Sequence, residues 1–393
     1  YGPDQPTGRG QGVIAEWVNA AKTGKPIQVF GSAQVQRDFL YLSDFLDSIR
    51  KILRSNHNRI VNIGSGKCES LSSIIEALKL AAIDLGSNAA RLLVVKVTEK
   101  PGSNADWKAL EYIRVPIRLG DDVFVHGQVG LARSKQLLET MQGFSSLIRA
   151  FEVDHAMACA TSALREASNG PALVKEIKAH TGLDLDLISG PMEAELLYMA
   201  QRSLAGPSDR IMTMDVGGGS TEISLLNGTS LVTSRSFQLG AVRILDRTDR
   251  EQDWKDLKEF IKKQVLEHAP THFYGSGGNI NKIFDLLKTK KGEPCTYKTL
   301  EKFYEQISAC TLDERVKLFA LNEDRADVIV PACRLFLWVM KHAEINRLTN
   351  SKLGLKEGII MALMNRFMGI EMPSVHDWAP GPLSDTTRLS TAE

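Results

Sequence analysis

The chain has 393 residues, of which 43% are hydrophobic, and this size and composition are typical of a globular protein with more than one core. Its 48 Lys and Arg residues nearly balance its 47 Asp and Glu residues, which argues against a protein that coats nucleic acid. No apolar run approaches the ~20 residues needed to cross a bilayer. The five cysteines are widely spaced and form no CxxC pair, so we expect reduced thiols and a cytoplasmic location.

Residues 1–80 contain few predicted elements. After a turn-rich start, the pattern predicts one helix over 13–21, short strands over 27–30 and 60–63, and a second helix from 71 to about 80. So few elements make a poor independent core. We therefore expect this stretch to be a piece of a domain.

The pattern changes at Ala81, where an apolar strand, an Asp, a Gly-Ser turn and a second apolar strand predict a hairpin. The same arrangement returns with Asp215, which follows Asp84 by 131 positions (215 − 84). A third glycine turn, over 274–287, leads into a helix-like run. Helical patterns such as 172–178 and 192–203 lie between the strands, so we expect a duplicated α/β fold.

The first turn contains residues suited to phosphate binding. Gly86 lets the backbone approach a ligand closely, and Ser87 and Asn88 add side-chain donors after Asp84. The alternative is an ordinary hairpin turn, in which Asp, Gly, Ser and Asn are common.

The second turn is harder to explain as a simple hairpin, because each glycine costs roughly 1 kcal/mol of folding entropy. A backbone cradle for phosphate uses such glycines, and the predicted set is Gly217, Gly218, Gly219, Ser220 and Thr221. Asp215 and Glu222 bracket this loop and are candidate ligands of Mg²⁺, directly or through water. Gly277 and Gly278 of the third turn complete the predicted phosphate-binding set.

Several segments together identify a family. The sequences IDLGSNAARLLV, ATSALREASN, ISGPMEAELLYM, MDVGGGSTEISLL and GSGGNINKI, with RADVIVPA and LGLKEGII further on, resemble the exopolyphosphatase and guanosine-pentaphosphate phosphatase family. The resemblance covers 81–367 and implies an actin-like (ribonuclease H-like) fold of two α/β domains with a cleft between them. Its domains would be 81–206 and 207–367, with the last helix returning to the first domain and a flexible tail at 368–393.

The resemblance also implies catalytic roles. Glu193 matches the glutamate that activates the attacking water, and Glu222 matches a second acidic residue that places Mg²⁺ or water. Gly190 and Pro191 predict a helix N-terminus, so Glu193 would lie in the first helical turn, where a carboxylate can act as general base. The alternative for Glu193 is a residue favoured there by the helix dipole alone.

Arg165 matches the family arginine of the ATSALREASN segment, and its guanidinium suits a phosphoryl group. The alternative is a surface salt bridge. The chain departs from the family pattern at four positions, which are Met192, Glu195, Asn279 and Ala332.

The implied function is Mg²⁺-dependent hydrolysis of the terminal phosphoanhydride of polyphosphate or guanosine pentaphosphate, with no membrane and no specific nucleic acid as partner. A homodimer is compatible with this expectation. The departures near Glu193 keep a second interpretation open, a regulatory module that binds guanosine tetra- or pentaphosphate with little turnover. A kinase of the same superfamily shares the phosphate loops, but the pairing of Glu193 with ATSALREASN favours a phosphatase.

Residues 1–78 resemble a different family. The stretch around Arg37, Asp38 and Phe39 is similar to the substrate-side part of NAD-dependent nucleotide-sugar epimerases and dehydratases, in which Arg37 would contact the nucleotide diphosphate. The GxxGxxG cofactor loop and the YxxxK pair of that family are absent from the sequence. Epimerase chemistry needs the cofactor, so we interpret 1–78 as a catalytically inactive remnant in a fusion chain.

Overall fold

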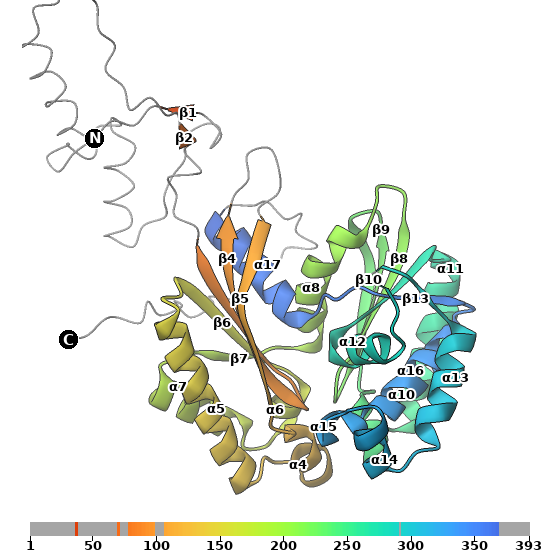
Figure 1. Ribbon diagram of the computed structural model, residues 1–393, viewed down its shortest axis with the longest axis horizontal. Coiled ribbons are helices and arrows are strands. Elements are labelled where there is room, and N and C mark those ends of the chain that lie inside the picture. Colours follow the sequence, from red (N-terminus) through yellow and green to blue (C-terminus); the bar gives the residue numbers. More distant parts are fainter. Residues whose placement is uncertain (1–35, 38–68, 71–77, 99–105, 291, 369–393) are drawn as a thin grey trace, which may run out of the picture. The chain divides into compact units, whose positions relative to one another are not determined.

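The computed structural model describes residues 36–37, 69–70, 78–98, 106–290 and 292–368 (Figure 1). The helix and strands predicted over 13–21, 27–30 and 60–63, and the tail predicted over 368–393, lie outside these residues except for Met368. None of the helices in this described part of the chain is both long and apolar enough to span a bilayer.

The chain divides into two compact units, Tyr1–Leu78 with Lys96–Lys108 and Lys79–Val95 with Ala109–Glu393. In the first unit, strand β1 (Gln36–Arg37) pairs antiparallel with β2 (Glu69–Ser70), so Arg37 lies opposite Glu69. The side chain of Arg37 is outside the described part of the chain.

The prediction of a helix up to about residue 80 is wrong at its end, while residues 71–77 lie outside the described part. Strand β3 (Lys79–Leu85) already begins at Lys79. Leu80 and Ile83 belong to one continuous buried run of this strand. Burial on both sides explains why the run lacks the alternation that marks a half-exposed strand.

The second unit contains a five-stranded sheet. Its strands are β3, β4 (Ala89–Thr98), β5 (Asp106–Pro116), β6 (His155–Ala160) and β7 (Leu185–Leu187). They lie in the order β5-β4-β3-β6-β7, with β6 parallel to both β3 and β7. The predicted hairpin at Ala81 is therefore the β3–β4 pair.

A six-stranded sheet repeats this arrangement. Its strands are β8 (Arg210–Val216), β9 (Thr221–Asn227), β10 (Ser230–Phe237), β11 (His272–Ser276), β12 (Cys295–Thr296) and β13 (Arg347–Asn350). The order is β10-β9-β8-β11-β13-β12, with β8, β11 and β13 parallel. In each sheet, three strands that follow one another in the chain lie at one side, β3 to β5 in one sheet and β8 to β10 in the other. The first strand of each set then pairs with a parallel strand, β3 with β6 and β8 with β11. This repeated arrangement confirms the predicted duplication.

Helices pack on both sheets (Figure 1). Those of the first half are α4 (Leu119–His126), α5 (Leu131–Ala150), α6 (Ser162–Glu166), α7 (Gly170–Thr181) and α8 (Gly190–Gln201), which ends in a 3₁₀ turn at Arg202–Leu204. Those of the second half are α9 (Ala241–Leu245), α10 (Glu251–Phe260), a π-helical turn at Ile261–Val265, α11 (Leu266–His268), α12 (Gly277–Leu286), α13 (Tyr297–Ser308), α14 (Leu312–Leu318), α15 (Glu323–Ala326), α16 (Ile329–His342) and α17 (Leu355–Met368). Helix α17 contacts α8 and the strands β3 and β6. The predicted boundary at residue 206 lies between the strands of the two sheets and stays a prediction.

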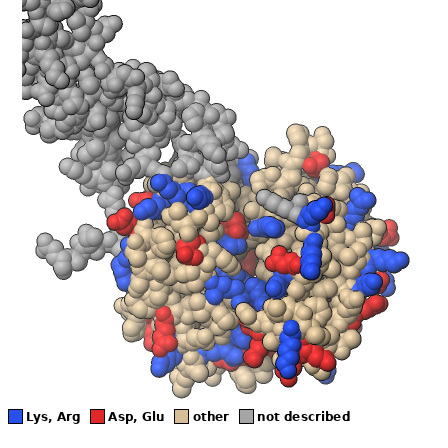
Figure 2. Space-filling view, in the orientation of Figure 1, with Lys and Arg blue, Asp and Glu red and all other residues tan. Residues whose placement is uncertain are grey.

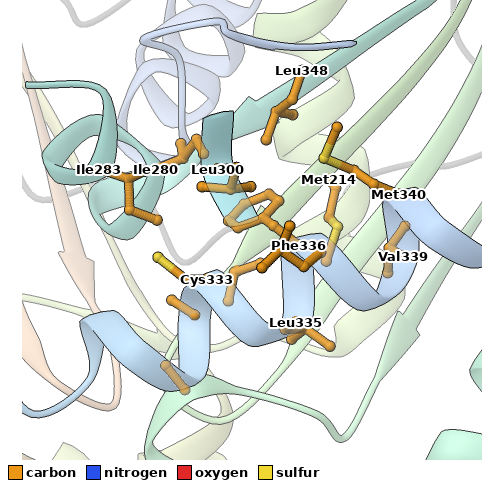
Figure 3. Packing of buried hydrophobic residues seen from close by; sticks show 14 of the residues in the cluster. Met214, Ile280, Ile283, Leu300, Cys333, Leu335, Phe336, Val339, Met340 and Leu348 are labelled. Atoms are coloured by element: carbon orange, nitrogen blue, oxygen red, sulfur yellow. The ribbon is translucent and has the colours of Figure 1, made fainter. Parts of the chain in front are cut away.

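The larger core lies between the six-stranded sheet and helix α16. Phe336 of α16 is fully buried beside Met214 of β8 and Ile280 of α12 (Figure 3). Gly275 of β11 makes this packing possible, because a Cβ atom there would lie 2.8 Å from Ile280 Cγ1 and 3.2 Å from Phe336 Cε1. This core holds β8, β11 and α12 in place. The site described next lies at the ends of β8 and β11 and at the start of α12.

Candidate active site

A cavity of ≈ 80 Å³ lies in the second unit where the loops after β3, β8 and β11 meet the first turn of α8. This volume is large enough for several small groups, since one water needs about 10–15 Å³. The predicted residues that line it are Asp84, Gly86, Ser87, Asn88, Glu193, Asp215, Gly217, Gly218, Ser220, Gly277 and Gly278. The structure therefore brings together residues from three loops and one helix.

The loop after β3 is a tight turn closed by a hydrogen bond from the Gly86 N–H to the Ala89 carbonyl oxygen, at 3.1 Å. Asp84 accepts a hydrogen bond of 2.7 Å from Arg91, and the hydroxyls of Ser87 and Ser162 are 3.0 Å apart. The polar groups of this loop are thus held by partners in the same sheet and in α6.

The loop after β8 lies directly against the first loop. A Cβ atom on Gly218 would lie 2.9 Å from Ser87 Cβ, and one on Gly219 would lie 2.4 Å from Ser162 Oγ. No side chain fits at either contact, so glycine is required for the close approach of the two loops. The Gly218 carbonyl oxygen also accepts a hydrogen bond of 2.9 Å from the Val242 N–H, which fixes the loop to the start of α9.

The loop after β11 starts helix α12 beside Asp215. Gly277 has φ +86°, and a Cβ atom there would lie 2.8 Å from Asp215 Oδ1. Ser276 donates a hydrogen bond of 2.7 Å to the other oxygen of Asp215. The N-terminus of α12, whose N–H groups favour anions, therefore faces the cavity. Asn279, one of the departures from the family pattern, donates to the Val216 carbonyl oxygen at 2.9 Å.

Glu193 lies in the first turn of α8, as the Gly190-Pro191 start predicts. Ser189 caps the helix by accepting a hydrogen bond from the Met192 N–H. The Glu193 residue is 7% exposed, and its Oε2 has no hydrogen-bond partner. Burial raises the pKa of this carboxyl well above its usual range, and the nearby Glu222 raises it further, whereas Arg165 lowers it. Glu193 is therefore a buried carboxylate that lines the cavity, with its Oε2 on the side of Arg165.

Four residues of the predicted site do not line the cavity. Thr221 is fully buried and donates its hydroxyl to the Leu239 carbonyl oxygen, so it is a packing residue rather than a phosphate ligand. The Gly219 carbonyl oxygen accepts a hydrogen bond from Arg243 instead of facing the cavity. The other two are Arg165, which contacts Glu193, and Glu222, which is the cross-strand partner of Asp215.

Arg165 is within reach of the predicted base rather than of the cavity. Its Nη1 donates to the Ile188 carbonyl oxygen at 2.6 Å and lies 3.7 Å from Glu193 Oε2. The predicted alternative, a salt bridge, is present, but its partner is Glu193, while the adjacent Glu166 pairs with Arg243. Arg165 can therefore stabilise the charge of Glu193.

The sequence profile of the Ppx/GppA phosphatase family matches residues 97–367, which is more than half of the chain. The chain belongs to the Ppx/GppA phosphatase family. A solved family member from Aquifex aeolicus is 25% identical, with a TM-score of 0.60, and the match covers 74% of this chain and 98% of the other. An exopolyphosphatase from Cytophaga hutchinsonii is 26% identical, with a TM-score of 0.62, and the match covers 75% and 99% of the two chains. Membership of this family supports phosphatase activity.

A second profile, that of the NAD-dependent epimerase/dehydratase family, matches residues 1–64. The predicted resemblance of the N-terminal stretch is thereby confirmed. The solved phosphatases match about three quarters of the chain and nearly all of their own length, which agrees with an added N-terminal segment.

Two neighbouring carboxylates of this Ppx/GppA phosphatase, one buried and one partly buried, fit a hard cation. Asp215 and Glu222 are cross-strand partners on β8 and β9, and each accepts a serine hydrogen bond, from Ser276 and Ser236 respectively. Burial raises the pKa of Asp215 to about 6, and burial with the charge of Asp215 raises that of Glu222 to about 7. Carboxylate oxygens that repel each other in this way suit Mg²⁺, which takes one or two carboxylates together with water and phosphate oxygens. Among the described residues, no group of three or more His, Cys, Asp or Glu side chains could hold a metal ion.

Sequence reasoning gave no role to the cationic side of the cavity. Arg91, Arg325, Lys356 and Tyr112 line it, and Lys and Arg side chains gather near the middle of the face shown in Figure 2. Arg91 pairs with Asp84 and Lys356 with Glu357, whereas Arg325 forms no salt bridge within the described residues. Arg325 is the first residue of the RADVIVPA segment, which resembles the family. That resemblance could have pointed to Arg325 as a site residue, but it gave the segment no role.

Proposed function

We propose that this phosphatase hydrolyses the terminal phosphoanhydride of inorganic polyphosphate or guanosine pentaphosphate, with Mg²⁺ and with Glu193 as general base. The observation that carries the proposal is the position of Glu193, a buried carboxylate that lines a cavity formed by glycine loops. A carboxylate of raised pKa in such a place is suited to take a proton from water near neutral pH.

The reaction would use the loops to hold the terminal phosphoryl group. N–H groups of the glycine loops and of the α12 N-terminus bind its oxygens. Glu193 accepts a proton from the attacking water, whose oxygen forms a bond to phosphorus while the bridging P–O bond on the opposite side breaks. The electron pair of that bond leaves with the shortened phosphate chain. Positioning and charge stabilisation provide most of the rate enhancement in such a transfer.

The cationic side suits a substrate with several phosphates. Burial, together with repulsion from Arg114 and Arg91, lowers the pKa of Arg325 to about 10. Arg325 is partly buried, and a cation removed from water without a salt bridge is unfavourable unless an anion neutralises it. The phosphates beyond the one being removed would fill this role.

Mg²⁺ would be held by Asp215 and Glu222, which fit it as oxygen donors. When bound, it would neutralise charge on the phosphate oxygens and complete its coordination with water. Glu222 does not line the cavity, so it would bind the metal on the side away from the substrate.

Phosphate release from tripolyphosphate, long-chain polyphosphate and guanosine pentaphosphate tests the proposal, with Mg²⁺ or with EDTA. Glu193→Gln should lower kcat by about 10²–10⁴-fold, the usual contribution of a general base. Glu176→Gln, an exposed position on α7, is the matched control. Full activity of a folded Glu193→Gln variant would remove the base assignment. Tight binding of guanosine tetraphosphate without phosphate release by the wild type would favour a regulatory module instead.

A further inference from the structure

Arg325 lies in helix α15, between Asp324 of the same helix and Asp327, the residue after it. Both aspartates pair with arginines of the first half of the second unit. Asp324 forms an ion pair with Arg114 of β5. Asp327 forms one with Arg118, which precedes α4, at 2.5 Å between Nη1 and Oδ2. The two aspartate side chains are only 9% and 14% exposed. Removing one partner of such a buried pair leaves an uncompensated charge, so both contacts are strong constraints on α15.

The first phosphate loop is tied to the same segment through Asn88. The Asn88 side-chain amide donates to the Asp324 carbonyl oxygen at 2.9 Å. The Asn88 carbonyl oxygen accepts a hydrogen bond of 3.0 Å from the Arg118 N–H. Asn88, predicted as a phosphate ligand, thus uses its amide group to join the loop to α15.

Arg118 has an unusual backbone conformation at this junction. It adopts the left-handed region, with φ 58° and ψ 45°, although it is not a glycine. Such strain persists only where the surroundings hold it. Its N–H is held by Asn88, and its side chain lies between Asp121, at 2.6 Å, and Asp327. The strained backbone therefore places the arginine where it reaches α15.

Arg325 itself has little else to fix it. It forms no ion pair among the described residues, and Arg91 and Arg114 repel it. Its Nη1 lies 2.8 Å from the position that a Cβ atom on Gly278 would occupy, so it passes over the start of α12. What orients Arg325 is the backbone of α15, which is held on both sides by the aspartate contacts.

We infer that Asp324 and Asp327 are positioning residues, which hold Arg325 at the cavity and couple it to the first phosphate loop. We call the set Asn88, Arg114, Arg118, Asp324 and Asp327 the α15 latch. The inference rests on the proposed function, because it assigns Arg325 to phosphates of that substrate. The α15 latch joins α15 to residues of the first half of the second unit. Arg325 lies on the cationic side of the cavity only while these contacts hold α15 in place.

The expected effect is on substrate binding rather than on the chemical step. Arg325 is assigned to the phosphates beyond the one being removed, whereas Glu193 acts on the water that attacks the terminal phosphoryl group. Loss of an interaction that is equally strong in the ground and transition states raises KM and leaves kcat unchanged. Asp327→Asn should therefore raise KM for tripolyphosphate by about tenfold, within the range of coupling between neighbouring residues, with kcat changed less than about twofold.

A double-mutant cycle with Arg325→Gln distinguishes positioning from general stability. If Asp327 acts through Arg325, Asp327→Asn has no further effect on KM once Arg325 is replaced. The exchange of charges in Arg118→Asp/Asp327→Arg should restore part of the affinity. Asp184→Asn is the matched control, because Asp184 pairs with Lys178 away from the cavity. Additive KM effects in the cycle, or an unchanged KM in Asp327→Asn, overturn the inference.

The same experiments separate this inference from the proposed function. If the wild type releases phosphate and the cycle is additive, only the latch is wrong. If the wild type releases no phosphate from any substrate, the proposed function fails, and the cycle is measured instead as the Kd of tripolyphosphate by calorimetry. Non-additive Kd values would then support the latch as part of a phosphate-binding site, and additive values would reject it.

Discussion

Asp215 and Glu222 lie directly opposite each other on the antiparallel strands β8 and β9, so their side chains share one face of the sheet. Glu222 is buried and Asp215 partly buried, and neither forms a salt bridge within the described part of the chain. Like charges in this arrangement destabilise the fold. This cost agrees with the proposal that the pair holds a cation, because sites of function are often kept at the expense of stability.

This relationship predicts that Glu222→Gln stabilises the metal-free protein at high pH. The folded pKa of Glu222, about 7, lies above its ordinary value, so the wild type loses stability as pH rises from about 4.5 through 7. Glutamine keeps the hydrogen bond from Ser236 and does not ionise. Urea unfolding without Mg²⁺ should show a gain of about 1–3 kcal/mol at pH 8 and no gain at pH 4, together with loss of phosphate release.

The control for this prediction is Glu251→Gln, because Lys255 lowers the pKa of the exposed Glu251 and the sign of the effect is opposite. That variant should gain nothing at pH 8. Equal destabilisation of Glu222→Gln at both pH values would mean that the carboxylate stabilises the fold, and the cation-site argument would fail.

Arg165 should set the pH at which Glu193 becomes active. A general base works in its ionised form, so kcat/KM rises with pH through the pKa of Glu193, which Arg165 lowers. Arg165→Gln should move the rising limb to higher pH by about one unit or more. Arg165→Lys keeps the charge and should leave the limb in place. If both variants moved it equally, the hydrogen bond to Ile188, rather than the charge, would be the cause.

The local parts of the site could be predicted from the sequence. Asp84 and Asp215 each follow an apolar run and precede glycine, and this pattern depends only on neighbouring residues. Gly190 and Pro191 predicted the helix start that places Glu193. Family resemblance supplied the roles, because spacing alone left turns and dipole effects as alternatives.

Contacts between distant segments could not be predicted in this way. Arg91 and Arg325 line one cavity although they are far apart in the chain. Asn88 likewise donates a hydrogen bond to Asp324, which is 236 positions away. Thr221 does not line the cavity, because strand β9 begins at that residue and its side chain is buried. Such outcomes depend on how the two sheets meet, which no local pattern records.

Gly277 should be required for activity beyond its backbone conformation. Its φ of +86° makes alanine cost about 1 kcal/mol, as at any such position, and a Cβ atom would also press on Asp215 Oδ1. Gly127, with φ +75° and nothing within 4 Å, is the matched control. Both alanine variants should lose unfolding free energy, Gly277→Ala more because of the contact with Asp215, but only Gly277→Ala should lose phosphate release, by about tenfold or more. Equal activity in the two variants would show that Gly277 does not shape the site.

Tyr112 should distinguish nucleotide from inorganic substrates. Its ring lines the cavity while the residue stays 46% exposed, and Lys356 Nζ lies 5.3 Å from the ring centroid. Stacking of a base on such a ring contributes about 1–3 kcal/mol. Tyr112→Ala should therefore raise KM for guanosine pentaphosphate about tenfold and change KM for tripolyphosphate little, because the latter has no base.

Tyr112→Phe separates the ring from its hydroxyl, since the hydroxyl is close enough to influence Arg91 and Arg325. If the ring stacks on a base, phenylalanine keeps the wild-type KM for guanosine pentaphosphate. If instead both variants raise KM for both substrates equally, the hydroxyl binds phosphate and the site does not select for a base. The ratio of the two KM values in Tyr112→Ala is therefore the measurement that assigns this phosphatase to nucleotides or to polyphosphate.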